Sequence, residues 1–90
     1  MSESPCILCG EVAKHQIANF RWDAFDCPVC GIYVISPDAK ERLARFPIEQ
    51  RLAISEKSKA LMPNEEFILE IIIENGQLVA KRTPRTNYSL

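Results

Sequence analysis

The sequence predicts an α+β protein of 90 residues whose successive segments differ in character. Residues 5–36 hold two cysteine couples among short β-branched and aromatic runs, residues 37–61 show helical spacing, and residues 66–83 place two apolar runs around an Asn-Gly dipeptide. These segments predict three short strands, one or two helices and a C-terminal β-hairpin. We expect a single domain over residues 1–90, because a chain of this length rarely holds more than one core.

The cysteine couples carry the strongest pattern in the chain. Each couple has two residues between its cysteines and a glycine directly after it, and 17 residues separate the couples; the ligand candidates are Cys6, Cys9, Cys27 and Cys30. Two intervening residues let one tight turn present both sulfurs to one ion, and glycine accepts the positive φ at the point where the chain turns back. The pattern predicts one tetrahedral Zn²⁺ bound by four thiolates at roughly 2.3 Å.

The two knuckles, residues 6–10 and 27–31, resemble those of zinc ribbons. They are most similar to the short N-terminal ribbons of many uncharacterised bacterial proteins, in which Cys-Pro-x-Cys-Gly precedes a Tyr-x-Ile-Ser stretch and a helix. Here that stretch is Gly-Ile-Tyr-Val-Ile-Ser over residues 31–36. The resemblance covers roughly residues 5–55 and implies a small zinc ribbon of three strands with a role in binding rather than catalysis. The knuckles also resemble those of rubredoxin, an iron electron carrier, although the gap here is shorter.

Other interpretations of the cysteines require features that the sequence lacks. Disulfides need an oxidising compartment, and the N-terminal residues show no basic region followed by an apolar run, so we expect reduced thiols in the cytoplasm. A thioredoxin-like redox couple needs one Cys-x-x-Cys beside a βαβ unit. A catalytic zinc needs an open coordination position, which four thiolates close. We therefore expect a structural zinc, and iron with a redox role is the alternative.

Composition and charge limit the classes of partner. The net charge is −1, and no apolar run approaches the length of a membrane helix, so we expect no membrane partner. Two basic and four acidic residues fall within residues 1–36, against six basic and four acidic within 37–62 and three basic and four acidic within 63–90. The acidic ribbon argues against DNA binding. A chain this short has a marginal core, so we expect the N-terminal half to require its metal.

Three strands are expected within the ribbon. Val12–Ile17 forms the first, Ala24–Cys27 the second and Ile32–Ile35 the third, because β-branched and aromatic residues favour strands. Residues 1–5 are expected to be a loose tail.

Four ring-bearing side chains lie in or near the first two of these strands. Phe20, Trp22 and Phe25 are expected to cover the metal and fill the small core, since aromatic side chains dominate small cores. An exposed Trp22 that anchors a partner is the alternative. His15 is expected to occupy a solvated strand position rather than to bind the metal.

The next segment begins with a helix signal. Ser36 is a good N-cap and is followed by proline, and Pro47 ends the helix at or before the residue that precedes it. A second helix is expected from Pro47 to about residue 60, with Ile48 and Leu52 facing the core.

The C-terminal segment is ambiguous between a hairpin and a helix. Asn75-Gly76 is the strongest short-range hairpin signal, and it predicts the cross-strand pairs Ile73–Leu78, Ile72–Val79 and Glu70–Lys81. The alternative is a helix over residues 65–76, capped by Asn64. The isoleucine content favours the hairpin. Residues 84–90 are expected to be a flexible tail.

No nucleophile–base arrangement, pair of catalytic carboxylates or phosphate loop is apparent, so we expect no enzyme. The leading hypothesis is a binding module whose partner is another protein or a protein–nucleic acid assembly. The second is direct nucleic-acid binding, with Trp22 or Tyr33 stacking on bases, through the basic residues Lys40, Arg42, Arg45, Arg51, Lys57, Lys59, Lys81, Arg82 and Arg85. The third is rubredoxin-like electron transfer with iron.

Overall fold

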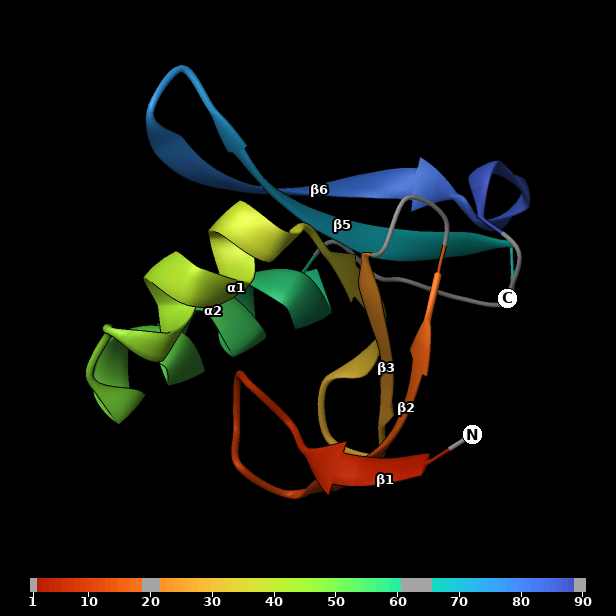
Figure 1. Cartoon of the computed structure of the whole chain (residues 1–90), viewed down its shortest axis with the longest axis horizontal. Coiled ribbons are helices and arrows are strands. Elements are labelled where there is room, and N and C mark those ends of the chain that lie inside the picture. Colours follow the sequence, from red (N-terminus) through yellow and green to blue (C-terminus); the bar gives the residue numbers. More distant parts are fainter. Residues whose placement is uncertain (1, 19–21, 61–65, 89–90) are drawn as a thin grey trace.

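The computed structural model describes residues 2–18, 22–60 and 66–88. Within them the elements follow in the order β1 (Ser2–Pro5), β2 (Val12–Ile17), β3 (Asp23–Cys27), β4 (Gly31–Ile35), α1 (Pro37–Ala44), α2 (Ile48–Ala60), β5 (Phe67–Glu74), β6 (Gln77–Pro84) and the short 3₁₀ helix η2 (Arg85–Asn87). The strands form one six-stranded sheet in chain order (Figure 1). The α+β class is confirmed, but the sheet is larger than the predicted three-stranded ribbon.

One parallel pair joins the N-terminal four strands of this sheet to the C-terminal two. β4 and β5 pair in parallel, whereas the other four neighbouring pairs are antiparallel. Parallel neighbours need a long crossover, and α1 and α2 provide it. Figure 1 shows β5 and β6 running across the direction of β2 and β3, with both helices in the angle between these two parts. The twist of the sheet therefore places the helices against strands from both halves of the chain.

The main core lies between the helices and the sheet. Its fully buried members include Tyr33 and Ile35 of β4, Leu43 of α1 and Leu69 and Ile71 of β5. The cysteines of the knuckles belong to the same cluster. Side chains alternate along a strand, so these residues of β4 and β5 share one face of the sheet with the metal-ligand candidates.

A smaller cluster covers the opposite face. Val34 and Ile68 are fully buried there, and Trp22 and Tyr88 pack against them with their ring centroids 5.9 Å apart. Of the aromatic residues expected to cover the metal, Phe25 lies in the main core, but Trp22 does not, and Phe20 lies outside the described residues. Trp22 is half-buried rather than exposed, and its alternative role as an anchor for a partner stays a prediction.

The C-terminal strands pair in the predicted register. Ile73 lies opposite Leu78 and Glu70 opposite Lys81, and Ile72 lies opposite Val79. Asn75 and Gly76 have φ of 53° and 76°, the left-handed conformations that a two-residue type I′ turn requires. The helix alternative for this segment is therefore wrong. The pair is also not a separate hairpin, because β5 joins it to the rest of the sheet.

Both ends of the described chain are more ordered than predicted. Residues 2–5 form β1, which pairs with β2, so a loose tail is wrong there. At the other end, β6 reaches Pro84, and the Tyr88 hydroxyl donates to the Glu70 carboxylate. A flexible tail is therefore wrong for residues 84–88. Both segments are ordered by pairing or contact with another strand, which their own composition does not reveal.

The first helix matches its prediction, whereas the second buries a different face from the one predicted. Ser36 accepts a hydrogen bond from the Ala39 amide at 3.2 Å, and α1 ends before Pro47. In α2, however, Ile48 and Leu52 are 44% and 43% exposed, and Ser55 is only 2% exposed. The prediction that the two apolar residues face the core is wrong, because α2 turns a largely polar face toward the knuckles.

Candidate metal centre

Two tight turns present the cysteines. The first knuckle follows β1, and the second joins β3 to β4. Gly10 and Gly31 end them with φ of 83° and 87°, as expected for glycine at each turning point. The Gly10 amide donates to the Cys6 carbonyl at 2.9 Å, which closes the first turn. Because β1 and the β3–β4 pair belong to one sheet, the sheet holds the two turns against each other.

The four predicted ligands come together at one point. All four Sγ atoms lie within 4.8 Å of one another, with 3.8 Å between Cys6 and Cys30 and 3.4 Å between Cys9 and Cys27. A tetrahedron with metal–sulfur bonds of roughly 2.3 Å has edges of about 3.8 Å, so the cluster fits a four-thiolate ion. The sulfurs are too far apart for disulfide bonds, which measure about 2.0 Å. The four cysteines are thus positioned to hold one metal ion.

The cluster is more closed on one side than on the other. Cys6, Cys27 and Cys30 are each 2% exposed, whereas Cys9 is only half-buried. The ion would therefore be shielded from water by protein on three corners of its tetrahedron. Any approach of solvent or of a competing ligand would be through the corner of Cys9.

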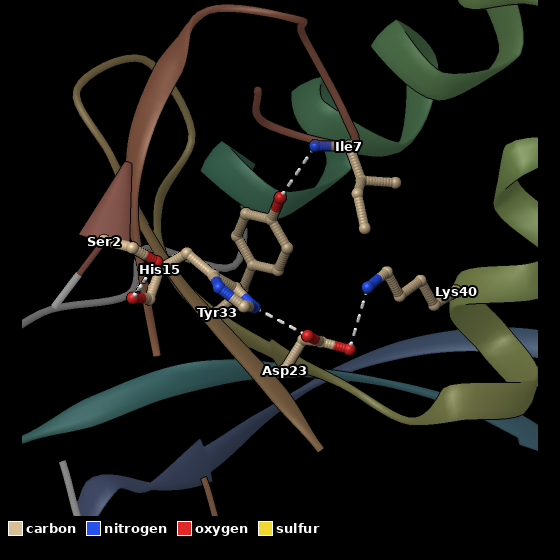
Figure 2. A network of polar contacts seen from close by, with 6 residues as sticks. All are labelled: Ser2, Ile7, His15, Asp23, Tyr33 and Lys40. Atoms are coloured by element: carbon tan, nitrogen blue, oxygen red, sulfur yellow. Dashed lines mark hydrogen bonds and ion pairs between the residues drawn. The ribbon is translucent and has the colours of Figure 1, made fainter. Parts of the chain in front are cut away.

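Two hydroxyl groups reach the sulfurs. The Tyr33 oxygen lies 3.1 Å from the Cys6 Sγ and accepts the Ile7 amide proton at 3.2 Å, as Figure 2 shows for the tyrosine and Ile7. Since that oxygen already accepts from Ile7, its own proton is free to point at the Cys6 sulfur. On the other side, the Ser55 Oγ of α2 lies 3.0 Å from the Cys30 Sγ. Hydrogen bonds from such outer groups orient metal ligands and tune the metal site.

Burial and hydrogen bonding shift the ionisation of these groups in opposite directions. Burial raises the pKa of the Cys30 thiol well above its ordinary value, despite the hydrogen bond with Ser55. Burial acts the same way on Cys6, but the Tyr33 hydroxyl and nearby backbone amides outweigh it and lower the pKa of that thiol. Burial, together with the neighbouring Cys6, also raises the pKa of Tyr33, which keeps the phenol protonated as a donor. A divalent cation favours the thiolate form throughout such a site.

Sequence reasoning missed the two hydroxyl donors. The hypothesis that Tyr33 stacks on bases is wrong, because this side chain is fully buried. Its position two residues after Gly31 in a strand is the signal that places it on the knuckle side. No comparable signal exists for Ser55, because its burial depends on how α2 docks.

Three of the basic residues expected to contact phosphate make contacts within the chain instead. Lys40 lies 3.3 Å from the Asp23 carboxylate, Arg42 donates to the Gly76 carbonyl, and Arg51 donates to the Ile7 carbonyl at 3.3 Å. These cations are occupied by contacts within the chain. Nucleic-acid binding through this helical segment gains no support from their placement.

His15 does not occupy the solvated position expected for it. Its side chain is half-buried, and the Nε2 atom lies 2.6 Å from the Asp23 Oδ1. The histidine is also absent from the cluster of potential ligands, which contains only the four cysteines.

No helix among the described residues is both long and apolar enough to cross a membrane. A scan of protein-family models finds no match, and neither the curated proteins nor the solved structures include a significantly similar chain. The likeness to zinc ribbons therefore rests on the knuckles, and what this chain shows by itself is a cysteine cluster positioned to hold a metal ion within a small α+β fold.

Proposed function

We propose that this protein is a small binding module that holds one structural Zn²⁺ through Cys6, Cys9, Cys27 and Cys30 and acts by interaction rather than by catalysis. The observation that carries the proposal is the convergence of the four sulfurs within 4.8 Å. Four thiolates complete the tetrahedral coordination of Zn²⁺ and leave no position for a substrate or an activated water. The metal would stabilise the fold and supply no reaction chemistry.

The choice of zinc rests on the donor set. Soft thiolate ligands in a tetrahedral arrangement select Zn²⁺ or iron, and Zn²⁺ has no redox chemistry. Iron in the same cluster would give a rubredoxin-like electron carrier, which is the alternative from another functional class. The metal that is bound in native cells decides between them.

The proposed partner is another protein. The proposed location is a thiol-reducing environment such as the cytoplasm. Large apolar side chains are exposed beside the knuckles and on the outer side of α2, namely Val12, Val29, Ile48 and Leu52. Apolar anchors of this kind support protein binding. The near-neutral charge and the internal contacts of Lys40 and Arg51 do not support the nucleic-acid alternative.

Metal analysis of the full chain, purified without a metal-affinity tag, tests the proposal. We expect one zinc per chain and no iron, and native mass spectrometry should show the loss of that mass after Cys27→Ser. A red, redox-active iron protein would replace the proposal with electron transfer. Tight DNA or RNA binding that weakens steeply with salt would replace the protein partner with nucleic acid.

A further inference from the structure

Helix α2 docks on the rest of the chain in an unusual way. Its large apolar residues Ile48 and Leu52 are exposed, while Ser55 is buried and Arg51 is half-buried. Ile54 gives the helix a partly buried apolar contact with the core. Helices in small proteins normally gain their stability by burying an apolar face. The attachment of α2 therefore depends on its polar contacts to an uncommon degree.

Two of those contacts reach the two knuckles separately. Ser55 lies 3.0 Å from the Cys30 sulfur in the second knuckle. Arg51, one turn earlier, donates from Nη1 to the Ile7 carbonyl in the first knuckle at 3.3 Å. Positions four apart lie on one face of a helix, so this face spans both turns that present the ligands.

The guanidinium of Arg51 has a further property. Its Nε is buried and has no hydrogen-bond partner. A buried cation is costly unless a compensating charge lies nearby. Four thiolates outweigh the positive charge of one Zn²⁺, so the loaded centre is an anion, and Arg51 contacts the knuckle that carries two of its ligands. The negative charge of the metal-loaded cluster thus compensates the positive charge of Arg51, whose Nε has no hydrogen-bond partner.

We propose that α2 is part of the metal centre: Ser55 and Arg51 are positioning residues that hold the two knuckles together, so that metal occupancy and the docking of α2 are coupled. The inference rests on the proposed metal-binding function. Ser55 donates to the Cys30 thiolate, and such charge-assisted hydrogen bonds are stronger than neutral ones. Removing the ion disorders the knuckles, because binding energy is folding energy at such sites, and the contacts of Ser55 and Arg51 are then lost.

The other elements do not depend on these contacts. Helix α1 buries Ala39 and Leu43 fully in the main core, and β4 pairs directly with β5. Neither interaction uses the side chains of Ser55 or Arg51. Metal removal should therefore release α2 while α1 and β5 stay in place.

Hydrogen exchange on the full chain tests the coupling directly. We expect the amides of residues 52–60 to exchange at least ten times faster after zinc is removed by a chelator, with little change in α1 and β5. The variant tests are Ser55→Ala and Arg51→Met, with Leu52→Ala as the control on the exposed face of the same helix. Coupling is reciprocal, so both test variants should release zinc to a chromogenic chelator about 10–100-fold more readily, while the control matches the parent chain.

Cobalt substitution separates a direct contact from a general loss of stability. Ser55→Ala should shift the thiolate-to-Co²⁺ charge-transfer band, because it removes a hydrogen bond to one ligand, and Ser55→Thr should restore the band. Leu52→Ala should leave it unchanged. Equal zinc release in all variants, or α2 exchange that is unaffected by metal removal, would overturn the inference alone. A parent chain that takes up neither Zn²⁺ nor Co²⁺ would overturn the proposed function together with it.

Discussion

The His15 Nε2 atom lies 2.6 Å from the Asp23 Oδ1, which joins two neighbouring strands through a carboxylate that is only 6% exposed. The second carboxylate oxygen lies 3.3 Å from the Lys40 Nζ of α1 (Figure 2). The imidazole also packs on Phe25, with 4.8 Å between ring centroids, and Phe25 stacks on Tyr33 at 5.2 Å. One buried acid therefore connects β2, β3 and α1 beside the aromatic layer that leads to the metal centre.

Replacing that acid should be costly. Asp23→Ala leaves the half-buried imidazole without its partner, and we expect the free energy of unfolding to fall by about 2–3 kcal/mol. Urea unfolding of the zinc-loaded protein measures the change. Asp26→Ala is the matched control, because Asp26 lies on the same strand and is exposed, and its effect should stay within about 0.5 kcal/mol. Equal effects at the two positions would show that the contacts of Asp23 contribute nothing to stability.

The turn between β5 and β6 gives a test of backbone strain alone. Gly76 has a φ of 76°, and a Cβ placed there would meet nothing within 4 Å. Gly76→Val should therefore cost about 2 kcal/mol or more through conformational strain, without any steric clash with neighbours. Gly76→Asn is the control, because asparagine tolerates this conformation, and it should cost less than about 1 kcal/mol. Thermal unfolding of the two variants compares them, and a valine as well tolerated as asparagine would contradict the type I′ turn.

Alkaline pH should weaken the packing of the C-terminal residues. Burial and the Glu70 carboxylate raise the pKa of Tyr88 above its ordinary value of 10.0. The folded state thus favours the protonated phenol, so this contribution to stability is fully present below pH 10 and is lost as the pH rises toward the folded-state pKa. The stability advantage of the parent chain over Tyr88→Phe should be constant at neutral pH and shrink above pH 10. An advantage that grows with pH would contradict the contact.

Loss of the metal should destabilise the two knuckles more than the rest of the chain. Cys27→Ser removes one thiolate, and we expect less than one zinc per chain, a fall in stability of several kcal/mol and broadened amide signals over residues 5–36. Val29→Ala is the control within the same knuckle, since that side chain is 44% exposed and is not a ligand. Amide spectra before and after chelation provide the second measurement. A spectrum that does not change on metal removal would show that the core does not need zinc.

The features predictable from the sequence are those encoded by local spacing. The knuckle glycines, the Ser36 cap and the Asn75-Gly76 turn each specify a conformation over a few residues, and the structure has all of them. The cysteine spacing likewise predicts the convergence of the sulfurs, since one turn delivers each couple.

The features that the sequence does not predict depend on contacts between distant segments. Nothing near Tyr33 in the sequence indicates that its strand pairs in parallel with the strand of Leu69. The spacing of Ile48 and Leu52 indicates a core-facing helix face, but the polar face with Ser55 is the one that docks. Periodicity identifies a helix and its apolar stripe, whereas the partner surface decides which stripe is buried.

The parallel pairing of β4 with β5 has a consequence for dissecting the chain. Val34 and Ile35 are fully buried on opposite faces of β4, and β5 covers the outer backbone edge of that strand. A fragment that stops after residue 36 would carry the complete set of cysteines but would expose this edge together with apolar side chains on both faces. Such an edge is a template for strand addition by further copies. The excised knuckle region should therefore bind metal and yet aggregate, as light scattering would reveal, so grafting the site into another scaffold requires a strand in the place of β5.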